Sequence, residues 1–298
     1  MPLVKPQLLP RTRMKTVLTT LAMGGIGLGV ITVMRRSYSQ AASGTPPAVF
    51  AGGPAFVSLP LESSEVVSHD TKRLRFIFPQ NDAVSGLSLT SAVLTMSWPK
   101  GKWLPVARPY TPISGTDDTG FLDLLVKQYP NGKQSTHLHS LQPGQTLLFA
   151  AAIKRYQWQP NSFPQVTLIA GGAGITPVCQ LARGILRNPQ DKTAINLIFG
   201  VNSDEDLLLK EEFDGYEREF PGRFKATYVV SHPKKASPFR KGYITEELLR
   251  GLAPRPANGN TKVFVCGPPA METSLVGKRG KTGALERLGY YRSQIQVF

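Results

Sequence analysis

The sequence predicts an α/β protein with an additional all-β domain: an N-terminal membrane anchor, an antiparallel β-barrel and a doubly wound parallel sheet. Three observations support this prediction. Residues 17–34 form an uncharged apolar run, residues 56–156 contain repeated short strands between turn residues, and residues 157–298 alternate strands with helices. With 298 residues, the chain is long enough for two ordinary domains.

The apolar run at residues 17–34 is 18 residues long. A helix that crosses a bilayer needs about 20 residues, and roughly 17–25 are tolerated. The preceding segment is basic, hydroxylated and free of acids, which is typical of a mitochondrial presequence. We therefore expect residues 1–38 to be a targeting leader and single-pass anchor. Basic residues flank the run on both sides, so its orientation stays open.

The barrel is expected over residues 56–156. Residues 39–55 are rich in Pro, Gly and small side chains and are expected to form a tether. At residues 72–78, apolar side chains alternate with basic ones, as in a half-buried strand. Residues 92–98 and 121–129 are further strand candidates, separated by turn residues.

The second domain is expected over residues 157–298, where the pattern changes. Apolar strands alternate with helices, which predicts a parallel, doubly wound sheet. The strand candidates are residues 166–170, 194–201, 226–231 and 262–266, and the helix candidates are residues 177–186, 204–220 and 246–252.

The net charge of +15 is divided between the N-terminal 40 residues and the rest of the chain. Residues 1–40 hold six basic residues and no acid, so they supply +6 and the remaining 258 residues carry +9. A basic surface suits an acidic partner or an anionic cofactor. Nucleic acid is disfavoured as a partner because the charge is dispersed and no recognition motif accompanies it.

We predict no metal site. Cys179 and Cys266 are far apart and form neither a metal-binding spacing nor a disulfide framework. His137 and His139 would share one face of a strand, but no third ligand lies nearby in the sequence.

The most informative short stretch is residues 108–114, which two prolines hold extended. The guanidinium of Arg108 suits a phosphate and the ring of Tyr110 suits a flat ring system. Thr111 and Ser114 add hydroxyls. On these residues alone, an exposed strand end with an incidental arginine is an equal alternative.

Two glycine-rich turns follow strands of the second domain. Residues 171–177 (GGAGITP) join a strand to a helix and would let a ligand approach the backbone. They lack the G-x-G-x-x-G pattern, which disfavours a simple Rossmann dehydrogenase. Residues 266–271 (CGPPAM) end another strand and can flank the same crevice. A tight structural turn and a buried inert thiol at Cys266 are the alternatives.

These motifs together resemble the NADH–cytochrome b5 reductases of the ferredoxin–NADP reductase superfamily. The match consists of R-x-Y-T-x-x-S, G-K-x-S, G-G-x-G-I-T-P, C-G-P-P-x-M and a C-terminal aromatic, in this order over residues 56–298. The basic leader and anchor most resemble the fungal mitochondrial form.

The resemblance implies a FAD-binding barrel followed by an NAD(P)H-binding domain. FAD would be held by the 108–114 stretch, by a V-K-x-Y strand and by a pyrophosphate turn that taken alone is an ordinary hairpin turn. The implied FAD residues are Arg108, Pro109, Tyr110, Thr111, Ser114, Lys127, Tyr129, Gly132, Lys133 and Ser135. Thr111 would lie beside the reacting flavin nitrogen, as the catalytic candidate.

The resemblance also implies the nicotinamide-nucleotide residues. They are Gly171, Gly172, Gly174, Thr176, Pro177, Ser231, Cys266, Gly267, Pro268 and Met271. Phe298 would lie near the flavin ring, although a terminal aromatic packed into the core is the alternative. Three departures stand out: Ala173 in place of Thr, residues 150–152 in place of a Gly-Pro turn, and Ser231 in place of Asp. The last leaves NADPH open beside NADH, because an acid there would repel a 2′-phosphate.

The implied function is transfer of a hydride from NADH to FAD, followed by single-electron transfer to cytochrome b5 or another acidic haem protein. We expect a monomer in the mitochondrial outer membrane, with a processed intermembrane-space form as a variant. Two alternatives stay open. One is a flavin reductase that feeds a desaturase or oxygenase, and the other is a membrane-tethered interaction protein with a decayed flavin site.

Overall fold

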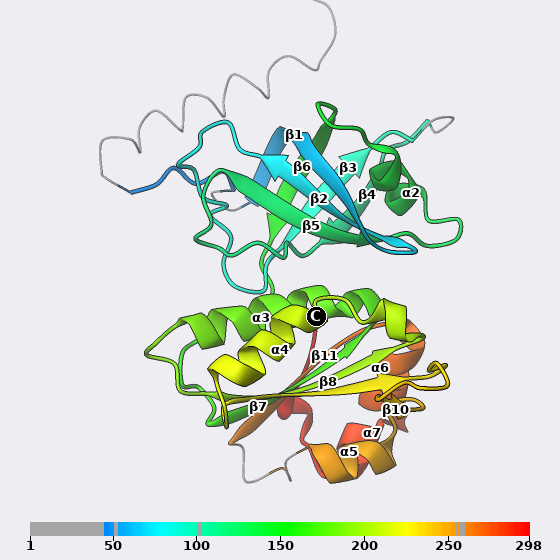
Figure 1. Cartoon of the computed structure of the whole chain (residues 1–298). Coiled ribbons are helices and arrows are strands. Elements are labelled where there is room, and N and C mark those ends of the chain that lie inside the picture. The colour runs from blue at the N-terminus through cyan, green and yellow to red at the C-terminus, as the bar shows by residue number, and fades with distance from the viewer. Residues whose placement is uncertain (1–44, 51–52, 100–102, 254–255, 257–259) are drawn as a thin grey trace, which may run out of the picture.

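The computed structural model describes residues 45–50, 53–99, 103–253, 256 and 260–298, which form two stacked domains (Figure 1). The predicted anchor at residues 17–34 lies outside the described residues. Within the described residues, no helix has the length and apolar character needed to cross a membrane.

The first domain is a six-stranded antiparallel sheet with strand order β4-β3-β6-β1-β2-β5. Its inner face buries a cluster that includes Phe50, Phe76 and Phe149, whose rings pack 5.2–5.9 Å apart between centroids. Ile113, just beyond β4, donates its N–H to the carbonyl of Asp123 on β5 (2.9 Å), so the two edges of the sheet approach each other. The strands are β1 (Gly53–Ser68), β2 (Thr71–Ile77), β3 (Ala92–Ser97), β4 (Val106–Tyr110), β5 (Phe121–Lys127) and β6 (Thr146–Ile153).

The end of the predicted tether is part of this first domain. Val49 donates its N–H to the carbonyl of Val84 (3.0 Å), and Phe50 is fully buried in the sheet's core. This packing could not be predicted from the sequence, because a single Phe among Ala, Gly and Pro residues shows no periodicity.

The second domain is a parallel six-stranded sheet with order β10-β9-β8-β7-β11-β14. Its strands are β7 (Gln165–Gly171), β8 (Ala194–Val201), β9 (Phe224–Val230), β10 (Arg240–Lys241), β11 (Thr261–Cys266) and β14 (Ile295–Val297). Strand β7 pairs with both β8 and β11, so the strand order reverses between β7 and β11. Such a reversal opens a crevice at the carboxyl ends of the strands.

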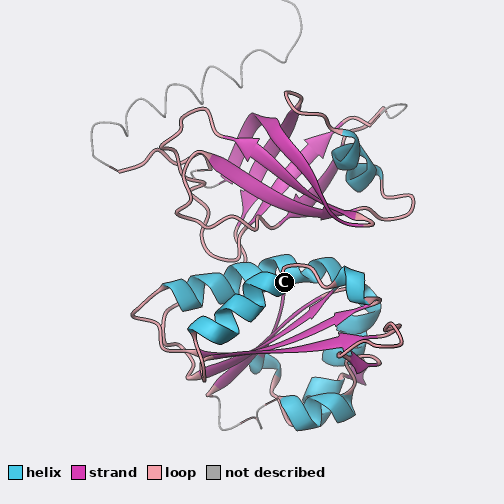
Figure 2. Ribbon diagram, in the orientation of Figure 1, coloured by secondary structure: helices cyan, strands magenta, loops and turns pink. Residues whose placement is uncertain are grey.

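Helices cover both faces of the parallel sheet, which confirms the predicted doubly wound arrangement (Figure 2). Helices α3 (Ile175–Arg187) and α4 (Lys210–Glu219) pack on one face, and α5 (Glu246–Leu252), α6 (Pro269–Val276) and α7 (Ala284–Arg287) pack on the other. Helix α3 lies between its sheet and the first domain (Figure 1). A small hairpin of β12 (Gly277–Lys278) and β13 (Lys281–Thr282) follows α6.

Three local predictions were wrong. His137 and His139 lie on helix α2 (Lys133–Ser140), not on a strand, and residues 132–136 begin that helix instead of forming a hairpin turn. The predicted helix at residues 204–220 is broken: a short turn spans Asp204–Asp206, Leu209 has a left-handed backbone (φ 59°), and α4 begins at Lys210. Apolar spacing alone does not reveal such a break.

Asp123 ties two strands of the antiparallel sheet together. Its carboxylate is 1% exposed and accepts hydrogen bonds from Arg75 Nε (2.8 Å) and Arg73 Nε (3.0 Å) on β2. Burial by itself would raise the pKa of Asp123, but the hydrogen bonds from Arg75 and Arg73 hold that pKa below its ordinary value of 3.8. A carboxylate with a lowered pKa stabilises the fold above its unfolded-state pKa, and this contribution is lost as the pH falls.

We predict that Asp123→Asn lowers the free energy of unfolding by about 2 kcal/mol at pH 7, because two half-buried guanidinium groups lose their charged acceptor. The difference from the wild type should shrink as the pH falls from the ordinary pKa of 3.8 through the lowered pKa of Asp123 in the folded protein. Urea unfolding at several pH values measures both effects. Asp82→Asn, at an exposed acid of the same domain, is the control. Equal stability of the two variants at pH 7 would contradict this account of the ion pairs.

Candidate active site

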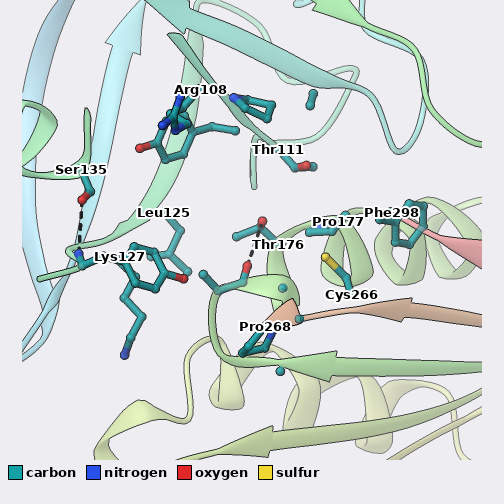
Figure 3. Close-up of a pocket in the computed structure, with 18 of the residues that line it drawn as sticks. Arg108, Thr111, Leu125, Lys127, Ser135, Thr176, Pro177, Cys266, Pro268 and Phe298 are labelled. Carbon is teal, nitrogen blue, oxygen red and sulfur yellow. Dashed lines mark hydrogen bonds between the residues drawn. The ribbon is translucent and has the colours of Figure 1, made fainter. Parts of the chain in front are cut away.

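A cleft of about 620 Å³ lies between the first domain and the carboxyl ends of β7 and β11 (Figure 3). It brings together most of the residues singled out in the sequence, although these are up to 190 positions apart in the chain. The predicted residues that line it are Arg108, Pro109, Tyr110, Thr111, Lys127, Tyr129, Gly132, Lys133, Ser135, Gly171, Gly174, Thr176, Pro177, Cys266, Gly267, Pro268 and Phe298.

Strand β4 supplies one wall of the cleft. Tyr110 packs partly against the core of the first domain, and burial raises the pKa of its hydroxyl, which therefore stays protonated. Arg108 is exposed, and its Nη1 donates to the carbonyl of Ala107 (2.8 Å). Within the described part of the chain Arg108 forms no ion pair, so its remaining donors are available to a ligand.

Helix α2 begins at the edge of the cleft. Its N-cap is Gly132, and no side chain caps the N–H groups of its first turn. Ser135 Oγ donates to the carbonyl of Gly132 (3.1 Å) and accepts from the N–H of Tyr129 (3.2 Å). A side chain at position 132 would collide with Ser135 Oγ and crowd the carbonyl of Tyr129, so glycine preserves the hydrogen bonds of this turn. Uncapped N–H groups and the helix dipole favour an anion here.

The cleft is electrostatically suited to a polyanion. Four cationic side chains, those of Arg108, Lys127, Lys133 and Arg155, line it, and none of the described lining residues is acidic. Lys133 and Arg155 are exposed and, like Arg108, form no ion pair with another described residue. Three uncompensated cations around one cleft raise its affinity for phosphate groups.

Lys127 lines the cleft as predicted, but it differs from the other three cations because its ammonium is paired. Its ammonium lies between the carboxylates of Asp70 (2.6 Å) and Asp206 (2.8 Å). Burial tends to lower the pKa of Lys127, but hydrogen bonds to Asp206 and Asp70 raise it overall. Because Asp206 belongs to the second domain, Lys127 links the two domains and does not present a free charge to a ligand. Asp70, Asp206 and His69 would otherwise be a possible metal cluster, but the Lys127 ammonium already lies between the two carboxylates.

The other wall consists of the two glycine-rich turns, which touch each other. A side chain at Gly174 would collide with the carbonyl group of Cys266, so this close approach excludes any other residue. Thr176 Oγ1 donates to the carbonyl of Ala173 (3.3 Å) at the start of α3. Figure 3 shows Thr111 and Thr176 on opposite walls of the cleft.

Cys266 lies in the wall of the cleft as a neutral thiol. Burial, reinforced by the nearby carboxylate of Glu272, raises its pKa to about 12. A thiol must ionise to act as a nucleophile, so this cysteine shapes the cleft and is not a nucleophile at neutral pH.

Phe298 packs against the core of the second domain and also reaches the cleft. Its N–H donates to the carbonyl of Val265 (3.1 Å), and its ring stacks on Phe264 with centroids 5.5 Å apart and planes at 17°. The ring also lines the cleft. The C-terminus is therefore fixed to the second domain at the junction of the two domains (Figure 1).

Four predicted site residues do not line the cleft. Ser114 is buried, and its Oγ accepts from the N–H of Asp123 (3.1 Å), so it supports β5 instead. Met271 packs behind Gly171, and Gly172 adopts a left-handed backbone (φ 50°) at the turn. Ser231 lies at the end of β9, two strands from β7, with its Oγ 3.0 Å from His232 Nδ1.

Sequence reasoning missed several lining residues: Thr90, Ala92, Leu125, Asn131, Gln134, Ala173 (noted above only for its departure from the family pattern), Arg155 and Pro269. Gln134 lies inside the G-K-x-S match at its variable position, and it is held by Ser97 (2.6 Å) and Thr95 (2.9 Å). Arg155 is next to the predicted domain boundary. A basic residue at the junction of two predicted cofactor domains was a signal that could have been used.

Comparison with known proteins agrees with this architecture. Residues 58–158 match the family described as "Oxidoreductase FAD-binding domain", and residues 168–276 match "Oxidoreductase NAD-binding domain". The NADH-cytochrome b5 reductase 2 of Pyricularia oryzae is 48% identical over 250 residues, which are 82% of this chain and 76% of that protein. The protein of the same name from Emericella nidulans is 44% identical over 290 residues, covering 95% and 90%.

A solved structure shares the two-domain fold. The cytochrome b5 reductase domain of Ulva prolifera nitrate reductase superimposes with a TM-score of 0.74 at 25% identity, covering 85% of this chain and 100% of that one. The motifs, the cleft between the two domains and these relatives agree, and the chain therefore belongs to the NADH–cytochrome b5 reductase family.

Proposed function

We propose that the protein is a flavin-dependent reductase that takes electrons from NADH and passes them to cytochrome b5. One observation carries this proposal: a single cleft joins an acid-free, cation-lined wall to two glycine turns at a reversal of strand order. Bound FAD would supply the redox chemistry, accepting a two-electron hydride from NADH and releasing the electrons one at a time.

The residues of the first domain fit a flavin dinucleotide. Arg108, Lys133 and the uncapped N-terminus of α2 offer donors and positive charge for the pyrophosphate. The ring of Tyr110 offers a flat surface for the flavin rings, and its protonated hydroxyl adds no charge. Thr111 offers a hydroxyl from the end of the same extended segment.

The residues of the second domain fit the nicotinamide end of NADH. Gly171, Gly174 and Gly267 allow the two turns to pack directly against each other at the edge of the cleft, and the first turn of α3 starts there. Phe298 also lines the cleft, so its ring would be displaced or bypassed when nicotinamide enters. Cys266 and Pro268 keep this part of the cleft free of charge.

The test is rapid mixing of the full-length protein, purified in detergent, with NADH. We expect flavin absorbance that NADH bleaches, and subsequent reduction of cytochrome b5 in preference to desaturase or oxygenase components. Arg108→Ala should weaken FAD binding at least about tenfold, because a charge-assisted hydrogen bond contributes about 1.5–3 kcal/mol. Lys225→Ala, at an exposed lysine on β9, is the control. A purified protein without flavin absorbance would refute the proposal.

NADH preference is proposed to depend on the end of β9. Ser231 occupies the position where an acid would bond the ribose hydroxyls and repel a 2′-phosphate. The neighbouring cation Lys234 forms an ion pair with Glu205, which reduces its attraction for that phosphate.

We therefore expect Ser231→Asp to raise the ratio of NADH to NADPH specificity at least about tenfold, since it adds one negative charge at the ribose. Parallel measurement of kcat/KM with both nucleotides tests this. Ser162→Asp adds the same charge before the amino end of β7, at the opposite end of the sheet, and should leave the ratio unchanged. An unchanged ratio in the Ser231 variant would exclude this position as the specificity determinant.

A single-pass anchor in the mitochondrial outer membrane is also part of the proposal, with a monomeric catalytic part. The apolar run at residues 17–34 and its basic flanks support it. We expect the full-length protein to stay in the membrane during alkaline carbonate extraction, and a variant without residues 1–38 to be released. Extraction of the full-length protein with the soluble fraction would argue against the anchor.

A further inference from the structure

We propose that Arg183 is a positioning residue of the reaction: its guanidinium fixes the separation between the segment that carries Thr111 and the turn that begins α3. This inference rests on the function proposed above. Arg183 does not line the cleft, but it lies on the helix whose first turn does, two turns beyond Thr176.

Arg183 bonds both domains at once. Its Nη1 donates to the carbonyl of Ile113 in the first domain, two residues after Thr111. Its Nε donates to Glu212 Oε1 on α4 (2.9 Å) and lies 3.3 Å from Tyr216 Oη. Because Arg183 is a rigid, planar fork, it can hold these groups in one fixed geometry.

The network around Arg183 is protected from solvent. The side chain of Arg183 is 13% exposed, and that of Glu212 is 24% exposed. Tyr216 donates its hydroxyl proton to the same oxygen of Glu212. The charges of Arg183 and Glu212 therefore balance each other, while one guanidinium arm is left for the carbonyl of Ile113.

The segment on the other side of this contact is equally well fixed. Ile113 donates its N–H to the carbonyl of Asp123 (2.9 Å), and its side chain is buried in the core cluster that contains α3 and β7. Its carbonyl is the acceptor for Arg183. Thr111 is thus two residues from a backbone unit that is held by β5 on one side and by α3 on the other.

The helix also approaches the first domain closely at the next residue. A side chain at Gly184 would collide with Leu89, which lies in the connection between β2 and β3. Arg187, one turn further on, is different: it is 56% exposed and lies 3.9 Å from Asp118. Arg187 therefore touches the same pair of domains without being fixed, which makes it a matched control.

Three full-length, flavin-loaded variants test the proposal: Arg183→Gln, Arg183→Lys and Arg187→Gln. In Arg183→Gln, we expect the rate of flavin bleaching at saturating NADH to fall at least about tenfold, because small displacements of reacting groups slow the reaction strongly. NAD⁺ affinity should change less than about threefold. The bleaching rate of Arg183→Lys should lie between those of the wild type and Arg183→Gln, since an ammonium cannot bridge the same groups.

Hydrogen exchange supplies a readout that does not depend on activity. The amide of Ile113 should exchange at least about tenfold faster in Arg183→Gln than in wild type. Arg187→Gln should match wild type in both bleaching and exchange. A primary isotope effect with NADH deuterated at the transferred position should rise in Arg183→Gln, because hydride transfer becomes the slow step.

The outcomes separate the two proposals. If Arg183→Gln bleaches at the rate of Arg187→Gln, or regains the wild-type rate at high NADH, the positioning role is refuted. If Arg183→Gln does not fold, a wild-type bleaching rate in Arg183→Lys refutes it. If the wild-type flavin is not bleached by NADH, the proposed function fails and not merely this inference.

Discussion

The packing of helix α3 against the first domain is the interaction on which the site depends. Ile113 and Leu125 belong to the first domain, yet they are buried in the same cluster as α3 and β7. Burying one such aliphatic side chain contributes about 1.5–3 kcal/mol, enough for two of them to hold the domains in one relative position. The cleft therefore has two walls at a defined separation. Thr90, whose hydroxyl donates to the carbonyl of Tyr156 (2.7 Å), fixes the connection between the domains.

The chemistry of the cleft follows from what its two walls lack. The barrel-side wall holds no acid among its described lining residues, and the second wall has no side chains at its glycines. Positive charge without counter-ions favours phosphates, and the uncharged residues that line the second wall suit a ring without charge repulsion. Acids that could have neutralised the cleft are engaged elsewhere: Asp70 and Asp206 pair with Lys127, and Asp123 pairs with Arg73 and Arg75.

Much of this architecture was predictable from the sequence. Period-two alternation located β2, and apolar runs located β7, β8 and β11, because burial imposes those patterns. The glycine turns were recognisable since few residues other than glycine permit such close contacts. Their convergence followed from the rule that parallel strands present their carboxyl ends at one edge.

The remainder depended on contacts between residues distant in sequence. Lys127 matched a cofactor motif, but its ammonium forms an ion pair with Asp206, 79 positions away. Ser114 matched another motif, but its Oγ accepts a hydrogen bond from the N–H of Asp123. Helix α2 was missed because it is short and polar, with its stability supplied by packing. Neither composition nor periodicity predicts whether a polar side chain contacts a ligand or another residue of the protein.

The most direct test of the central claim is a crystal structure of the protein with FAD and NAD⁺ bound. The account predicts the flavin pyrophosphate at the N-terminus of α2 beside Arg108, with the nicotinamide against the turns at Gly171 and Cys266. Both rings would then lie in the one cleft between the domains. Density for FAD outside this cleft, or for NAD⁺ at another edge of the parallel sheet, would contradict the account.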